Sequence, residues 1–467
     1  MIWSGSTCWI LKARATGSSI MKKLFLYSFY HSVKNLILVA FRIFYRKTVF
    51  IRRDRLRVDR PTILVTNHPS TMTDPLNAAA RMNTMVHFLA NAGMFQHWFS
   101  NWFFSTFYCI PIGRSIDKTG KRKVDNEDSF ARCDDFLTGG GCLYIAPEGG
   151  SHFERRLQRL KTGTARIALS AENKNDFQLG LVIRPVGLAY SAQTDFRSDV
   201  LVNSGAVLRV ADYEQSYRED PIEAVQQLTA DLTERLRDLV IHTQDDEEDT
   251  TLRQVEAIQQ ASEPLDWESH VHRTRETLKR LQQLRREKET YANWRERLTQ
   301  LETALTERGS DYRSLHDAGQ GVLRASNRRR ALALILGLPL FLYGWINNYL
   351  ANAIPGFLAQ WSMPPRLYIG YQSTVKLMSA LIFYPLFYGI QLYLVQRWGG
   401  QWWLTALYLL SLYPTGIFAW RYRARWRTWR RAVRMLEWRG KAAETVDRWV
   451  ATQRDLLSDL AQIKAEA

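Results

Sequence analysis

The long apolar stretches near the C-terminus constrain this chain most. Residues 331–365, 377–396 and 398–420 contain no charged side chain. At ~1.5 Å per helical residue, each stretch is long enough to cross a hydrocarbon core of ~30 Å. The mean hydropathy of the whole chain is nevertheless negative. We therefore expect a polar part of the chain to be joined to C-terminal transmembrane helices.

Basic side chains flank this membrane domain, residues 331–420. Three consecutive arginines, Arg328–Arg330, precede it, and seven arginines between Arg421 and Arg434 follow it. The positive-inside rule places both clusters in the cytoplasm, which requires an even number of crossings. The net charge is +17, and the arginine clusters beside the apolar segments favour anionic lipid over nucleic acid as the partner.

Three apolar stretches and an even number of crossings do not agree, so we expect two or three spans. We expect the first stretch to fail to cross, because Pro355, Pro364 and Pro365 favour an irregular segment there. Residues 421–467 are expected to form a basic cytoplasmic helical tail.

The first 50 residues predict a segment that lies at the membrane interface. Residues 24–45 are aromatic and apolar but include His31, Lys34 and Arg42. Aromatic side chains at headgroup depth with basic groups beside them are typical of an interfacial helix. Residues 1–20 precede Met21, which fits a natural start better than Met1, and we assign them no function.

Residues 51–242 have the texture of an α/β domain. Short apolar runs predict buried strands, and helical patterns lie between and after them. Strands are expected at 62–66, 142–146 and 181–188, and helices at 128–137, 163–171 and 221–241. Strands that alternate with helices favour a mostly parallel sheet covered by helices. Within this domain, residues 94–112 are rich in aromatic side chains, which fits either a core helix or a surface that faces membrane or acyl chain.

Residues 243–330 change to a charged helical composition. Leu284, Tyr291, Leu298 and Leu305 recur every seven residues, which predicts a short coiled coil or a helical hairpin. This region is a charged linker, and we expect a homodimer through residues 252–305 as one use of the heptads.

The four cysteines, Cys8, Cys109, Cys133 and Cys142, contain no C-x-x-C pair and lie near no His cluster. They predict small buried side chains and a reducing compartment, with no disulfide framework and no metal site.

One candidate for proton transfer follows the first strand. His68 leaves the buried strand into a turn, and Asp74 lies a few residues on. A carboxylate beside a histidine fixes the tautomer of the imidazole and stabilises the imidazolium that forms when it takes a proton.

Other candidate residues follow further strand-like runs, where α/β folds place ligand sites. Arg114 ends an apolar run, and a guanidinium can hold phosphate through two hydrogen bonds. Glu148 and Gly149 lie at the end of residues 142–146, and Lys161 opens a helix whose positive end suits an anion. Pro185 within residues 181–188 predicts an edge or irregular strand.

Taken in order, these blocks resemble the phospholipid and glycerol acyltransferase family. The family has an Asn-His…Asp block, an apolar block that ends in Arg, a Pro-Glu-Gly block and a late strand with Pro. The matching segments here are 67–74, 110–114, 147–151 and 182–185. The resemblance covers roughly residues 60–215. The form PEGGSH followed by LKTG is similar to the branch that contains fungal glycerol-3-phosphate and dihydroxyacetone-phosphate acyltransferases.

Two departures from the family pattern concern the site. The usual spacing places four residues between His and Asp, whereas five lie between His68 and Asp74. The common Glu-Gly-Thr-Arg form is replaced by residues 148–151, so an arginine often found there is missing. Phosphate binding must then depend on Arg114, Lys161 or Arg166.

The resemblance implies a mechanism for this chain. His68 takes the proton from an acceptor hydroxyl, which attacks the thioester of an acyl-CoA or acyl carrier protein, and Asp74 orients His68. Arg114 holds the phosphate of the acceptor, and Glu148 acts on a hydroxyl or through a backbone network. No cofactor, metal or covalent acyl-enzyme is expected. Glycerol 3-phosphate and 1-acylglycerol 3-phosphate both stay open as the acceptor.

The expected protein is thus an integral membrane enzyme of phospholipid biosynthesis with its catalytic domain on the cytoplasmic face. The alternative from another class is a membrane-anchored coiled-coil scaffold that binds lipid without catalysis. The heptads and the arginine clusters fit both hypotheses, but a scaffold has no need of the ordered His, Arg and Glu blocks.

Overall fold

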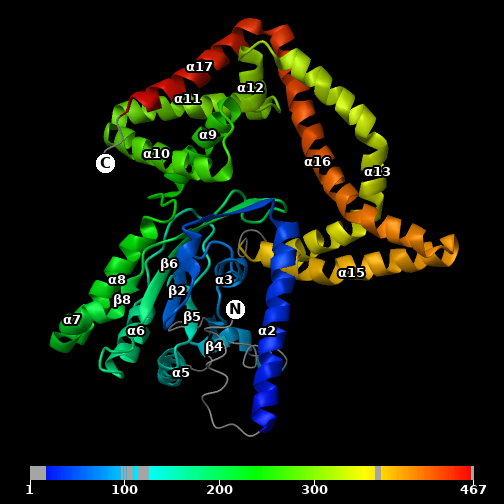
Figure 1. The fold of residues 1–467 in the computed structure, drawn as a ribbon. Helices are drawn as coiled ribbons and strands as arrows, with labels where there is room; N and C mark the ends of the chain where they lie inside the picture. The colour runs from blue at the N-terminus through cyan, green and yellow to red at the C-terminus, as the bar shows by residue number, and fades with distance from the viewer. Residues whose placement is uncertain are drawn as a thin grey trace. The chain divides into compact units, whose positions relative to one another are not determined.

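The computed structural model of the chain describes residues 17–95, 98, 101–102, 109–113, 126–362 and 370–463 (Figure 1). The chain divides into two compact units. Met1–His242 with Met363–Thr374 form the first unit, and Thr243–Ser362 with Val375–Ala467 form the second. The two units are described in turn.

The first unit is built on a mostly parallel sheet. Its strands are β1 (Lys47–Ile51), β2 (Thr62–Thr66), β3 (Val86–Asn91), β4 (Cys109–Ile112), β5 (Cys142–Ile145), β6 (Val182–Tyr190), β7 (Asp199–Ser204) and β8 (Leu208–Arg209). They lie in the order β1-β7-β6-β2-β5-β3-β4, and β8 pairs with β6 beside this path. Among the described strands, β6 pairs antiparallel with β7 and β8, and the other pairs are parallel. The predicted fold class is confirmed.

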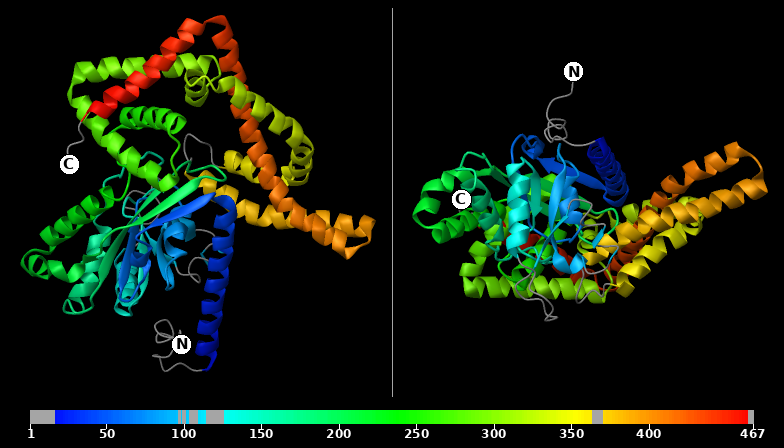
Figure 2. Two further views of the ribbon diagram at one scale, coloured as in Figure 1. Left: turned by 45° about the horizontal axis from the view of Figure 1, so that its top comes forward. Right: turned by 90° about the horizontal axis from the view of Figure 1, so that it is seen from below.

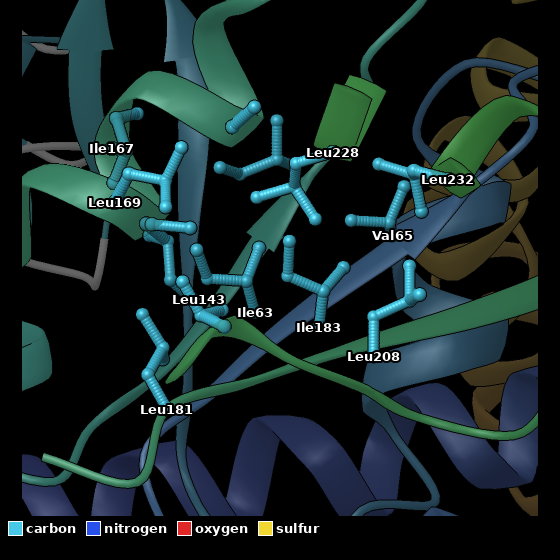
Figure 3. Packing of buried hydrophobic residues seen from close by; sticks show 14 of the residues in the cluster. Ile63, Val65, Leu143, Ile167, Leu169, Leu181, Ile183, Leu208, Leu228 and Leu232 are labelled. Atoms are coloured by element: carbon cyan, nitrogen blue, oxygen red, sulfur yellow. The ribbon is translucent and has the colours of Figure 1, made fainter. Parts of the chain in front are cut away.

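Helices cover both faces of this sheet, as the views in Figure 2 show. They are α2 (Gly17–Phe44), η1 (Arg53–Leu56), α3 (Thr73–Ala79), η2 (Ala92–Phe95), α5 (Asn126–Thr138), α6 (Gly163–Asn173), η3 (Val210–Tyr213), α7 (Glu214–Glu219) and α8 (Pro221–Arg237). On one face, α5, α6 and α8 pack on Ile63 and Val65 (Figure 3). Leu64 points to the opposite face, because successive strand residues alternate in direction, and α3 packs on it there.

The buried apolar runs locate the central strands well. β2 has its predicted bounds, with all five residues buried. β5 ends one residue before its predicted end, and β6 begins one residue later and ends two residues later than predicted. The predicted helix at 221–241 ends at Arg237 instead. It begins where the sequence indicates, because Asp220 accepts hydrogen bonds from the first-turn amides and Pro221 takes the first helical position.

The prediction that Pro185 marks an edge strand is wrong. β6 lies inside the sheet between β7 and β2, and Pro185 pairs with Val65. On its other side, β8 pairs with residues 182–183 and β7 with residues 186–190. Pro185 thus lies between the residues that pair with β8 and those that pair with β7. No strand partner there needs the backbone N–H that proline lacks. The alternative prediction of an irregular strand describes β6 correctly.

Most of the aromatic segment 94–112 lies outside the described residues, so the two alternatives for it stay open. Of its described side chains, Trp98 is 83% exposed and Trp102 is 53% exposed. Ile110 in β4 is buried in the core.

The second unit begins with a bundle of helices. They are α9 (Asp246–Ser262), α10 (Trp267–Arg286), α11 (Lys288–Glu307) and α12 (Tyr312–Gly319), with α17 (Ala443–Gln462) packed on them. The heptad side chains Tyr291, Leu298 and Leu305 of α11 are buried, and so is Trp294 between them. Trp294 donates its indole N–H to the carbonyl of Leu456 in α17, at 3.2 Å. These side chains of α11 therefore pack within the chain, and the homodimer through residues 252–305 stays a prediction.

Three long helices carry the apolar stretches. They are α13 (Leu323–Ser362), α15 (Tyr371–Gly399) and α16 (Trp402–Lys441). Pro355 lies inside α13, so the predicted irregular segment does not begin there. Pro364 and Pro365 lie outside the described residues. α13 and α16 run side by side in Figures 1 and 2.

Among the described residues, three helices are long and apolar enough to cross a membrane, namely Leu24–Phe44 within α2, α13 and α15. These helices indicate membrane association. α13 therefore has the length and composition of a span, as expected from its sequence, whereas our prediction that the first stretch fails to cross rested on its prolines. The tryptophan-rich α16 is not among these three helices. Leu24–Phe44 likewise has the character of a span as well as of an interfacial helix.

Candidate active site

The predicted histidine and aspartate lie in contact at the carboxyl end of β2. His68 Nδ1 is 3.0 Å from Asp74 Oδ2, and the Asp74 side chain is fully buried, whereas that of His68 is 18% exposed. With Nδ1–H donating to the carboxylate, Nε2 presents its lone pair to an incoming hydroxyl. This pair has the contact that a general base with an orienting carboxylate requires.

The carboxylate of Asp74 is held by further donors. Its Oδ2 accepts the backbone N–H of Ser70 at 2.6 Å, and its Oδ1 accepts the hydroxyl of Tyr190 at 2.7 Å. Burial, with the nearby charge of Asp74 second, raises the pKa of Tyr190 well above its ordinary value, so this phenol stays protonated and donates. Sequence reasoning missed Tyr190, although it ends the strand that carries the late Pro block.

The five residues between His68 and Asp74 are accommodated by a turn at residues 69–72. Thr71 in this turn has φ 44°, which is uncommon for a β-branched residue and costs backbone strain. Its N–H donates to Ser151 Oγ at 3.1 Å. The turn at residues 69–72 takes up the additional residue. Asp74, at the start of α3, therefore still reaches the imidazole.

Glu148 ties two loops of the site together. Its Oε1 accepts the backbone N–H of His68 at 2.8 Å, and its Oε2 accepts that of Gln158 at 3.0 Å. The side chain is buried. In addition, the N–H of His152 donates to the carbonyl of His68 at 3.0 Å. Of the two roles predicted for Glu148, this geometry favours the backbone network, because each carboxylate oxygen already accepts an amide.

Gly149 and Lys161 also lie together. Gly149 has φ 69°, and a Cβ added there would stand 2.5 Å from the Nζ of Lys161. The Lys161 side chain therefore covers the backbone of Gly149, and Lys161 is itself exposed. An exposed ammonium above a Glu-Gly-Gly turn suits an anion. Of the other two phosphate candidates, Arg166 stacks on the ring of Phe130 at 5.3 Å, and Arg114 lies outside the described residues.

Two further contacts fix the strand ends below the site, and sequence reasoning did not find them. Asn67 exchanges two hydrogen bonds with the backbone of Leu188 in β6, at 3.0 and 2.8 Å. The hydroxyl groups of Thr66 and Tyr144 are 2.7 Å apart. These bonds join β2 to both of its neighbours just before His68. An Asn directly before the His was the available signal for the first of them.

The burial of Glu148 predicts a pH dependence of stability. Burial raises its pKa to about 6, while the amides of Gln158 and His68 act in the opposite direction. The unfolded value is ~4.3, so the folded chain holds the proton more tightly between these two values. The stability that this group contributes is therefore present at low pH and is lost as the pH rises through about 6.

We expect Glu148→Gln, which is neutral at every pH, to remove this dependence. As the pH rises from about 4.5 to about 6.5, the wild type should lose about 2 kcal/mol of free energy of unfolding relative to Glu148→Gln. Its Tm should fall relative to that of the variant. Tryptophan fluorescence in detergent measures both melting curves. The exposed Glu154→Gln is the matched control and should show a flat difference. A flat difference for Glu148→Gln as well would contradict the raised pKa.

Comparison with known proteins gives a match to a family model. Residues 47–189 match the model described as Acyltransferase. This segment contains the described site residues from His68 to Lys161 and most of the sheet.

Two curated yeast proteins are similar to part of this chain. Glycerol-3-phosphate O-acyltransferase 2 of Saccharomyces cerevisiae is 35% identical over 115 residues, which is 24% of this chain and 15% of that protein. Glycerol-3-phosphate O-acyltransferase 1 of the same yeast is 33% identical over 108 residues, 23% of this chain and 12% of that protein. The similar segment thus spans less than a fifth of each yeast protein.

Among solved structures, the chain is similar to the 1-acyl-sn-glycerophosphate acyltransferase PlsC from Thermotoga maritima. The two are 16% identical, with a TM-score of 0.32, over 48% of this chain and 85% of that chain.

Proposed function

Because residues 47–189 form a domain of the acyltransferase family, we propose that this chain transfers an acyl group from acyl-CoA or acyl carrier protein to a hydroxyl of a glycerol phosphate. The acceptor is glycerol 3-phosphate or 1-acylglycerol 3-phosphate. The observation that carries the proposal is the contact of His68 with the buried Asp74, at 3.0 Å. A non-catalytic scaffold offers no reason for a buried carboxylate to orient a partly exposed imidazole.

In the proposed reaction, Nε2 of His68 takes the proton of the acceptor hydroxyl as its oxygen attacks the thioester carbonyl. The carbon–sulfur bond then breaks, and His68 returns the proton to the leaving thiolate. Asp74 stabilises the imidazolium between these two steps. Glu148 holds the backbone of His68, so that the base keeps its place relative to both substrates.

Transfer to a defined acceptor tests this function. Purified full-length chain in detergent is given one long-chain acyl-CoA with either acceptor, and the acylated product is measured by mass spectrometry. The proposal expects lysophosphatidate from the first acceptor or phosphatidate from the second. Release of free fatty acid without either product, or no turnover at all, would overturn it.

Lys161 and Arg114 are proposed to bind the acceptor phosphate. We expect Lys161→Ala to raise the KM for the acceptor roughly tenfold with a smaller change in kcat, because a group that holds the phosphate equally in ground and transition states gives uniform binding. Arg114→Ala should act likewise, with Arg114→Lys between it and wild type. Initial rates at varied acceptor concentration measure both. Lys279→Ala, on an exposed face of α10, is the control. A rise in the KM for acyl-CoA alone would contradict this assignment.

We propose that the catalytic domain faces the cytoplasm, where soluble acyl donors occur. The seven arginines between Arg421 and Arg434 support this orientation for the end of α16, since basic segments stay on the cytoplasmic side. In a cysteine-free background, Arg313→Cys and Ala451→Cys should react with an impermeant maleimide from the same side of sealed vesicles. Labelling from opposite sides would show an odd number of crossings between them.

A further inference from the structure

The turn at residues 69–72, between His68 and Asp74, contacts a part of the chain that is distant in sequence. Ser70 Oγ lies 2.7 Å from Ser373 Oγ, and Thr71 Oγ1 lies 2.8 Å from Thr374 Oγ1. The hydroxyl of Thr71 also donates to the carbonyl of Gly370, at 3.2 Å. Gly370–Thr374 belongs to the same compact unit as the site. About 300 residues after the turn, the chain therefore returns to it.

This contact between the turn and Gly370–Thr374 is buried. Ser70 and Ser373 are fully buried, and Thr71 and Thr374 are 4% and 8% exposed. A Cβ added at Gly370 would stand 3.0 Å from Ser151 Oγ and 3.3 Å from the carbonyl oxygen of Pro69. Each of these buried hydroxyls needs a hydrogen-bond partner, because a buried hydroxyl without one destabilises the fold.

The same two residues of the turn hold the reacting groups. The N–H of Ser70 donates to Asp74 Oδ2, the oxygen that also contacts His68 Nδ1. The N–H of Thr71 donates to Ser151, in the loop that carries Glu148. The side chains of Ser70 and Thr71 thus point to Gly370–Thr374, while their amides fix the two loops of the site.

The conformation of Thr71 needs such support. At φ 44°, a β-branched residue is strained, and a strained residue persists only where its surroundings over-determine it. The bonds from its hydroxyl to Gly370 and Thr374 supply part of that support. Without them, the turn is free to relax, and Ser70 would lose its alignment with Asp74.

We propose that Gly370–Thr374 is a positioning element of the acyltransferase site. Its hydroxyls at Ser373 and Thr374 hold the turn at residues 69–72, so that Asp74 stays aligned with His68. This inference rests on the proposed function. The element is a part of the active site that lies far outside the family-matched segment.

The first test concerns the contact and does not depend on activity. The full-length double variant Ser70→Cys, Ser373→Cys is oxidised in detergent, denatured and titrated with a polyethylene-glycol maleimide. We expect the two new thiols to form a disulfide and to become unreactive until reductant is added. The two single variants are controls and should keep every thiol reactive. Failure of the double variant to form the bond would overturn the proposal, even if the wild type is fully active.

The second test concerns positioning. The variant Ser373→Ala, Thr374→Val removes both hydroxyls but leaves every proposed catalytic and phosphate-binding residue in place. We expect kcat to fall between about tenfold and a hundredfold, with the KM for the acceptor within about twofold, because misplaced reacting groups slow the chemical step. Ser373→Thr, Thr374→Ser keeps both hydroxyls and should restore most of the rate.

Ser379→Ala is the matched control, since the hydroxyl of Ser379 bonds to carbonyls of its own helix. It should have the kcat of wild type. Retention of more than half the wild-type kcat by Ser373→Ala, Thr374→Val would overturn the positioning role, as would an equal loss in Ser379→Ala. If the wild type transfers no acyl group to either acceptor, the proposed function fails, whereas the disulfide test still decides whether the contact exists.

Discussion

Replacing His68 with alanine should lower the rate of acyl transfer by about 10²–10⁴-fold, because alanine removes the proposed general base, which takes the proton of the acceptor hydroxyl. The chain should still fold and enter membranes. The contact of residue 68 with Glu148 uses a backbone N–H, which alanine keeps. The carboxylate of Asp74 also keeps its bonds from Ser70 and Tyr190.

The comparison is made on kcat with saturating acyl-CoA and acceptor, for membranes with equal amounts of each protein. His272→Ala, at an exposed position of α10, is the matched control and should have wild-type activity. If His68→Ala keeps more than about a tenth of the rate, His68 is not the general base.

Asp74→Asn should also slow transfer, roughly 100-fold, but without abolishing it. An asparagine fits the same space, with its oxygen accepting from His68 and Ser70 and its amide donating to the oxygen of Tyr190. The fold is therefore kept, and what is lost is the negative charge that stabilises the imidazolium during proton transfer. The effect should lie in kcat and not in the KM for either substrate.

A second buried aspartate provides the control for this exchange. Asp134 in α5 is 2% exposed and accepts from Ser170 and Lys174, and it lies in none of the motif segments. Asp134→Asn is expected to lower Tm with little change in kcat. Equal kcat values for Asp74→Asn and wild type would mean that the carboxylate only supports the fold.

The sequence predicts the centre of this fold better than its margins. β2, β5 and β6 are continuous apolar runs because they are buried on both faces. The strands that were missed are short or carry polar residues, such as β8 with two residues and β7 with Asp199 and Asn203. The rule that a proline marks an edge strand failed at Pro185. This proline lies between the residues of β6 that pair with β8 and those that pair with β7, and on its other side β6 pairs with β2.

The same limit applies to the site. The motifs were enough to name His68, Asp74 and Glu148, since these residues occur in fixed order at strand ends. Several of the contacts that support them were not predictable, because they join residues distant in sequence. Tyr190 is 116 residues from Asp74, and Ser373 is 303 residues from Ser70. A local pattern contains no information about such pairs.

The length of α16 has a consequence for the helical bundle of the second unit. Its uncharged part ends at Trp420, and the helix continues through its arginines to Lys441. At ~1.5 Å per residue, that continuation is about 30 Å long, as much again as the hydrocarbon of a bilayer. Arg431 and Arg439 on this continuation contact Asp311 and the carbonyl of Ala318. α16 thus acts as a spacer, which holds α12 on its charged continuation, up to about 28 Å along the helix from the end of its uncharged part.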